Sequence, residues 1–246
     1  MAGHSKWANI KHRKGRQDAL RGKMNTKLIR EITVATKESG GDPSSNPRLR
    51  LAMDKASRAN VTKDSIKKAI DKGMGTMDGA DYQEVRYEGY GPQGVAILVF
   101  CLTDNKNRTV AEVRHAFSKY GGNLGTDGSV SYLFNRQAKI VVQGSVDDEA
   151  LMSHALDCGA DDFSQGETPD TVVLTLPPAH LATAVDALKS HDYVVEHADN
   201  HWVADMIQPL DATGVEKTLV LYEVLLDLDD VQSVFTNADL GQGLMD

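Results

Sequence analysis

The sequence of 246 residues is poor in cysteine and has no long apolar run. Its two cysteines, Cys101 and Cys158, share no CxxC spacing and flank no histidine pair, so we expect both to be small, buried apolar residues in a reducing compartment. The longest apolar run, Val95 to Leu102, has the length of a strand, whereas a membrane span needs roughly 18 apolar residues. No apolar stretch follows the first charged residues, which argues against a secretory signal. These absences predict a cytoplasmic protein without a membrane span.

Motifs that indicate catalysis are also missing. The sequence has no GxSxG elbow and no HExxH helix, and its eight histidines are scattered. His197, Asp199 and His201 alternate along an expected strand and could ligate a metal, but we interpret them as surface polar residues. We therefore expect no enzyme, no cofactor, no metal and no small-molecule substrate.

Two glycine-rich segments resemble nucleotide-binding loops only in part. Residues 89–94 match GxGxxG, but that pattern binds a dinucleotide between a strand and a helix, and here we expect a strand on both sides. We interpret the segment as a hairpin turn. Residues 121–129 lack the Gly-Lys-Ser/Thr ending of a nucleoside-triphosphate loop, so we favour a sharp connection between a helix and a strand. Phosphate binding with Arg108, Arg114 and Lys119 remains the alternative.

Charge is distributed very unevenly along the chain. The net charge is −8, but residues 1–75 hold 18 Lys+Arg against 7 Asp+Glu, a net of +11, and residues 76–246 have a net of −19. Such asymmetry indicates a basic element that meets a polyanion, joined to an acidic body that keeps the protein soluble.

The strongest local pattern is the basic segment at the N-terminus. Residues 1–30 contain nine Lys+Arg and one acid. Arginine offers a planar fork for phosphate, lysine a mobile point charge, and an embedded Trp or His a ring that can stack on an unpaired base. A solvated tail or a contact with an anionic membrane is the alternative, but apolar residues are too sparse for an insertable face. We predict these nucleic-acid-binding residues: Lys6, Trp7, Lys11, His12, Arg13, Lys14, Arg16, Arg21, Lys23 and Lys27.

Hydrophobic periodicity predicts an α+β chain. Residues 1–75 read as a mobile basic arm, to about Gln17, and a three-helix bundle with an apolar stripe that includes Met24. Residues 76–135 and 201–246 read as a discontinuous α/β domain, with strands at 84–90, 95–102 and 129–134. Residues 136–200 follow the βαββαβ order of an inserted ferredoxin-like domain, with its last strand at 193–197 and a separate strand at 203–207.

Several blocks closely resemble the YebC/PmpR family of bacterial regulatory proteins. They include residues 3–14, Gly-His-Ser-Lys-Trp-Ala-Asn-Ile-Lys-His-Arg-Lys, residues 103–109, Thr-Asp-Asn-Lys-Asn-Arg-Thr, and residues 114–130. The resemblance implies an N-terminal helical bundle preceded by an arm, and two α/β domains, one inserted in the other. It also implies a role in gene expression without catalysis, because family members are named as DNA-binding transcriptional regulators and relatives include a mitochondrial translational activator.

Two functions remain open at this point. The first is a DNA-binding transcriptional regulator whose cations neutralise phosphates, although no recognition helix of a known type is visible. The second is a translation factor that places the same residues on ribosomal RNA, because Trp7 and His12 suit unpaired bases.

We predict that binding to nucleic acid is strongly salt-dependent. Each neutralised phosphate of duplex DNA contributes a slope of about −0.9 in log K against log salt, so roughly five contacts give about −4 to −5. Fluorescence anisotropy over a salt series measures this slope. A slope near zero would mean that the basic segment is not the binding element.

Overall fold

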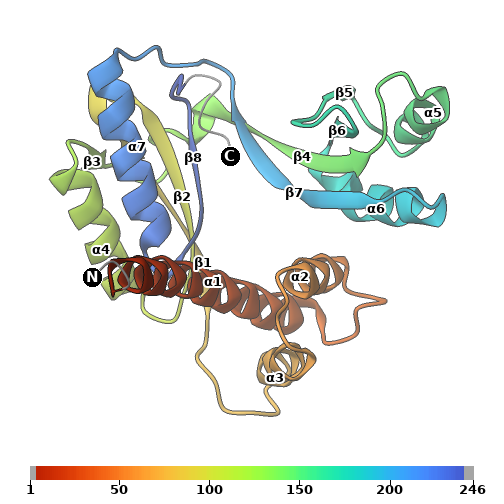
Figure 1. The fold of residues 1–246 in the computed structure, drawn as a ribbon, viewed down its shortest axis with the longest axis horizontal. Helices are drawn as coiled ribbons and strands as arrows, with labels where there is room; N and C mark the ends of the chain where they lie inside the picture. Colours follow the sequence, from red (N-terminus) through yellow and green to blue (C-terminus); the bar gives the residue numbers. More distant parts are fainter. Residues whose placement is uncertain (1–3, 241–246) are drawn as a thin grey trace. The chain divides into compact units, whose positions relative to one another are not determined.

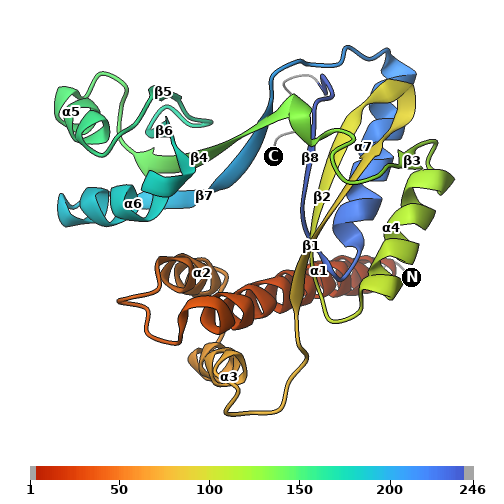
Figure 2. The ribbon, with the colours of Figure 1, turned by 180° about the vertical axis from the view of Figure 1, so that it is seen from behind.

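The computed structural model describes residues 4–240, with side chains from Gly22 onward, and the chain forms two compact units (Figure 1, and Figure 2 from behind). The first unit contains the residues up to Glu84 together with Leu102–Asp104, and the second contains Val85–Cys101 and the residues from Asn105 onward. A helical region is thus followed by two sheet-containing regions, which confirms the predicted α+β class. Within residues 4–240, no helix is long and apolar enough to cross a membrane.

Three helices form the first unit: α1 (His4–Ser39), α2 (Pro47–Arg58) and α3 (Lys63–Gly73). All three contribute apolar side chains to one core, namely Ile32, Ala35, Leu49, Ala52, Ala56, Ile66 and Ala69. Local signals end and begin these helices, since Gly40 follows α1 with a φ of 87° and Thr62 Oγ1 accepts the Ser65 N–H at the start of α3. Met24 is exposed, so its predicted place in the apolar stripe is wrong.

The basic segment is helical, whereas we expected residues 1–17 to be a mobile arm. Residues 1–3 lie outside the described part, and from His4 the backbone belongs to α1. Once the bundle holds the second half of α1, each residue added to the helix gains a hydrogen bond without a new nucleation cost. Alanine, lysine, arginine and glutamine also favour the helix. The basic arm of the predicted fold is therefore an extension of the first bundle helix.

Asn46 joins the first two helices. Its side chain is fully buried, and its Oδ1 accepts the Leu49 N–H at 3.0 Å, which caps α2. Its Nδ2 donates to the carbonyl oxygens of Ala35 and Gly40, at 2.8 and 2.7 Å. One amide thus hydrogen-bonds both the start of α2 and the end of α1.

The first sheet has the strand order β3-β1-β2-β8, with β1 (Gln83–Tyr90), β2 (Ala96–Thr103), β3 (Asn123–Leu124) and β8 (Val231–Thr236). Helices α4 (Lys106–Lys119) and α7 (Ala212–Asp227) supply Val113, Phe117, Leu221 and Leu225 to a core with Val95, Ile97, Val99 and Cys101. The one-turn helix η1 (Pro92–Gly94) connects β1 to β2, and the Gly91 N–H donates to the Val95 carbonyl at 2.7 Å. The predicted hairpin turn at residues 89–94 is confirmed.

The second sheet has the order β5-β6-β4-β7 and is antiparallel throughout. Its elements are β4 (Phe134–Gln143), α5 (Glu149–Asp157), β5 (Asp162–Gln165), β6 (Thr171–Leu176), the one-turn helix η3 (Pro178–His180), α6 (Leu181–Ser190) and β7 (Val195–Ala204). The succession βαββαβ with β4 and β6 at the centre is the ferredoxin-like arrangement that the sequence predicts.

Two predicted strand boundaries are wrong. Residues 129–134 do not form one strand, because η2 (Ser131–Leu133) turns the chain and β4 begins only at Phe134. The strands expected at 193–197 and 203–207 are instead the single strand β7, which pairs with β4 from Phe134↔Ala204 to Val142↔Val195. Polar residues such as Asn135 and Asn200 interrupt the apolar pattern, but the backbone ladder continues through them.

We predict that Asn46→Ala lowers the free energy of unfolding by about 2–3 kcal/mol, because it removes the cap of α2 and the buried amide donor to the Ala35 and Gly40 carbonyls. Urea denaturation measures the change. Thr62→Ala is the control, since it removes only the cap of α3 at an exposed position and should cost about 1 kcal/mol or less. Equal losses for the two variants would show that Asn46 acts as a cap alone.

Candidate nucleic-acid interface

The described part of α1 carries a row of cations on one face. Lys23, Lys27, Arg30 and Lys37 follow one another at helical spacings of four, three and seven residues, which places them on a common side of the helix. The opposite side contributes Ile32 to the bundle core. Packing of the bundle therefore directs this cationic face away from the core.

The predicted primary residues all lie on this one helix. Lys23 and Lys27 are described and partly exposed. The remaining eight lie on α1 at positions whose side chains are outside the described part, namely Lys6, Trp7, Lys11, His12, Arg13, Lys14, Arg16 and Arg21. Because an α-helix rises 1.5 Å per residue, the ten positions extend along roughly 32 Å of the helix axis. A rod of this length can follow several phosphates of a nucleic-acid strand.

Arg48, on α2 of the first unit, binds three carboxylates of the same unit. Its Nε lies 2.9 Å from Glu31 Oε1, its Nη1 lies 2.6 Å from Glu38 Oε2, and its Nη2 pairs with Glu84. Burial alone would lower the pKa of the guanidinium, but the nearby Glu31 and Glu84 carboxylates outweigh it and raise the pKa of Arg48. Arg48 therefore ties α1, α2 and the start of β1 together, a role that sequence reasoning missed.

The second group of predicted residues does not form a single cluster. Arg108 Nη2 lies 2.6 Å from the buried carboxylate of Asp230, and the Thr109 hydroxyl donates to the same carboxylate at 2.7 Å. Arg114 and Lys119 are exposed on α4. Lys119 lies three helical turns from Arg108 on the same side of α4, whereas Arg114 lies on another side. Arg108 connects α4 to the start of β8.

A buried carboxylate holds the glycine-rich segment 121–129 and the residues that follow it. Glu88 Oε2 accepts the N–H groups of Val130 and Ser131, both at 2.8 Å, and the Glu88 carbonyl accepts the Gly125 N–H at 2.8 Å. Burial would raise the pKa of Glu88, but backbone N–H groups of Val130, Gly128 and Ser131 outweigh it and lower the pKa to about 2. The Val130 and Ser131 N–H groups thus already have an anionic partner, which supports the structural interpretation of the segment.

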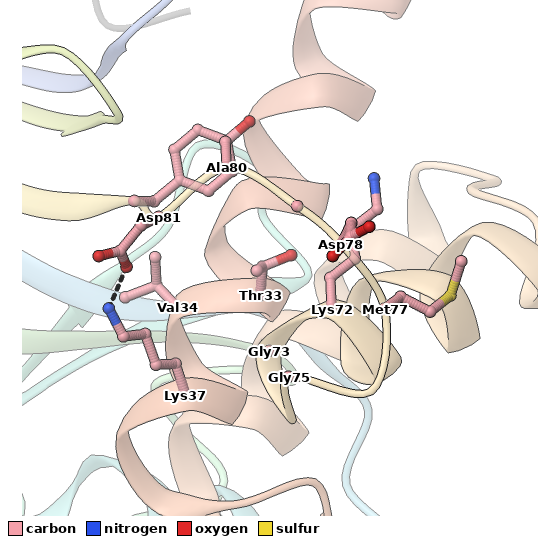
Figure 3. Close-up of a pocket in the computed structure, with 12 residues that line it drawn as sticks. Thr33, Val34, Lys37, Lys72, Gly73, Gly75, Met77, Asp78, Ala80 and Asp81 are labelled. Atoms are coloured by element: carbon pink, nitrogen blue, oxygen red, sulfur yellow. Dashed lines mark hydrogen bonds and ion pairs between the residues drawn. The ribbon is translucent and has the colours of Figure 1, made fainter.

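A cavity of about 300 Å³ opens in the first unit (Figure 3). It lies between α1, the end of α3 and the segment that leads to β1, and its polar lining includes Thr33, Lys37, Lys72 and Asp81. No three metal-ligating side chains converge there or elsewhere in the described part of the chain. In particular, His197 bonds to Asp199 at 2.8 Å, while the His201 ring contacts the Phe235 ring.

Comparison with known proteins identifies the family of this chain. The family model described as "TACO1/YebC protein N-terminal domain" matches residues 5–76, and the model described as "TACO1/YebC second and third domain" matches residues 82–238. The chain therefore belongs to the TACO1/YebC family, which confirms the resemblance found in its sequence motifs.

Individual relatives agree with this assignment over the whole chain. A probable transcriptional regulatory protein of Methylococcus capsulatus is 56% identical over 245 residues, covering 100% of this chain and 98% of the relative. The transcriptional regulatory protein PmpR of Pseudomonas aeruginosa is 52% identical over 245 residues, with coverage of 100% and 98%. A crystal structure of a conserved hypothetical protein from Aquifex aeolicus superposes with a TM-score of 0.82 at 41% identity, covering 93% of this chain and 94% of that one.

We predict that Glu88→Gln lowers the free energy of unfolding by about 2–3 kcal/mol at neutral pH, because a buried charge-assisted acceptor is lost. The folded-state pKa is about 2, below the ordinary value of 4.5, so this stabilisation is complete above about pH 5 and is lost as the pH falls toward 2. Urea denaturation of both proteins at pH 7 and near pH 3 measures the difference.

The control for this measurement is Glu216→Gln, since Glu216 is exposed on α7. Its effect on stability should be small at both pH values. A Glu88→Gln effect that stays constant with pH would contradict the assigned role of the carboxylate.

Proposed function

We propose that the chain is a cytoplasmic, non-enzymatic regulator of gene expression that binds nucleic acid through the cationic face of α1, and that DNA is its target. The observation that supports this proposal most is the row of cations that begins with Lys23 and Lys27 on a helix whose opposite side is buried. Relatives named transcriptional regulatory proteins agree with this function.

The proposed contacts are mainly to phosphates. Lysine and arginine on an exposed helix neutralise phosphate charge and release counterions, which gives affinity without sequence information. The predicted residues from Lys6 to Lys27 supply these contacts, and Trp7 and His12 add ring faces for stacking. Arg114 and Lys119 on α4 are secondary candidates for nucleic-acid contacts. The ion pair between Arg108 and buried Asp230 favours a structural role for Arg108.

The acidic remainder of the chain restricts where a polyanion can bind. Residues 76–246 carry a net charge of −19, so their summed field repels phosphates at long range. Nucleic acid is therefore directed to the basic unit, and the acidic body is free to face a protein partner.

Ribosomal RNA is the alternative target, because Trp7 and His12 lie among the cations and suit unpaired bases. Sedimentation of ribosomes from lysate at moderate salt separates the two targets. A DNA-binding regulator should remain in the supernatant. Co-sedimentation that resists DNase would instead assign the protein to translating ribosomes.

We predict that changing five cations of residues 1–17 to glutamine weakens DNA binding about 100-fold or more at low salt while the melting temperature stays nearly unchanged. These cations are Lys6, Lys11, Arg13, Lys14 and Arg16. Anisotropy titrations and thermal denaturation of the full-length variant provide the two measurements.

A second comparison uses two described pairs with equal charge and spacing. Lys23→Gln with Lys27→Gln removes cations from α1, and Lys63→Gln with Lys67→Gln removes the same charge from α3. Binding should fall much more for the α1 pair. Equal losses would mean that the net charge of the unit matters and its α1 face does not.

A further inference from the structure

The segment between α3 and β1 covers part of the cationic face of α1. Asp81 forms an ion pair with Lys37, and the Arg30 guanidinium lies 5.3 Å from the centre of the Tyr82 ring (Figure 3 shows the ion pair). Val34 lies between these two cations along the helix and is only 4% exposed, although it belongs to the side of α1 that faces away from the bundle core. Residues 77–82 line the same cavity as Val34.

The covering segment has the chemistry of a polyanion mimic. Residues 76–84 contain the acids Asp78, Asp81 and Glu84 and no lysine or arginine. Carboxylates placed on lysine and arginine occupy the positions that phosphate oxygens would take. The ring of Tyr82 on Arg30 likewise occupies a position where an unpaired base would stack.

The segment is weakly held. Residues 74–81 are all exposed, and the Lys37–Asp81 pair has side chains that are 51% and 68% exposed. Exposed ion pairs of this kind add little to stability, and the cavity beneath the segment leaves it loosely packed. Displacing the segment therefore requires little free energy.

We propose that Arg30, Lys37 and Lys72 form a second binding site for the phosphodiester backbone, which residues 76–82 cover in the free protein and uncover when nucleic acid binds. Lys72 extends the α1 row across the cavity from α3. The site rests on the proposed function, since it lengthens the same cationic face beyond Lys27. A phosphate that reaches Lys37 or Arg30 replaces the Asp81 carboxylate or the Tyr82 ring there.

Asp81→Asn tests the competition, with Asp64→Asn as a matched control. Asp64 pairs with Lys68 on α3, and those side chains are 72% and 59% exposed, so both variants remove one exposed ion pair and one negative charge from the same unit. At low salt, Asp81→Asn should tighten binding of a fluorescent oligonucleotide at least about 3-fold more than Asp64→Asn. Equal effects would overturn the proposal.

Amide hydrogen exchange on the unmodified full chain gives an independent readout. Residues 76–82 should exchange faster when a saturating oligonucleotide is bound, while the buried part of α1 keeps its protection. Unchanged or slower exchange in the segment would overturn the covered site and leave binding through Lys6 to Lys27 intact. Failure of the parent protein and of every variant to bind any oligonucleotide would overturn both this site and the proposed function.

Discussion

Burial of one side of α1 is the constraint on which the basic unit depends. Ile32 and Ala35 pack against α2 and α3, and the helical period then fixes the direction of every other side chain on the helix. The core thereby sets the side of the helix on which Lys23, Lys27, Arg30 and Lys37 lie. Asn46 secures this arrangement at the far end of α1, where a single buried amide satisfies both helix ends. The cationic face proposed to bind nucleic acid is thus a consequence of hydrophobic packing on the opposite side of the same helix.

Much of the fold follows from local patterns. The three-helix bundle, the turn at residues 89–94 and the βαββαβ order of residues 136–200 are all predicted from such patterns. The errors arise where tertiary structure overrides the local pattern. Segment 1–17 lacks an apolar stripe, so the sequence predicts an arm. A helix that already packs in the bundle can nevertheless extend through residues without such a stripe. The ladder between β4 and β7 likewise continues through polar residues because backbone pairing does not depend on them.

The sequence predicts which residue types make up the candidate interface. It does not predict which of the cations form ion pairs within the protein. From the sequence alone, Arg48, Arg108 and Lys37 cannot be distinguished from the other cations near them. In the structure, Arg48 and Arg108 bind carboxylates that lie far away in the sequence, Glu84 and Asp230. The role of Glu88 cannot be predicted from the sequence either. Its partners are the backbone N–H groups of Val130 and Ser131, more than forty positions away. Long-range pairing of charges is the information that a single sequence does not carry.

The ladder between β4 and β7 also determines how the ferredoxin-like domain is attached. Phe134 is paired with Ala204, so the chain departs from the first sheet and returns to it at two neighbouring residues, roughly 5 Å apart as in any antiparallel pair. All of the residues between these two points, 135–203, belong to the ferredoxin-like domain and its connecting strands β4 and β7. The domain is therefore a topological insertion, since both of its covalent connections to the rest of the chain pass through one pair of facing residues.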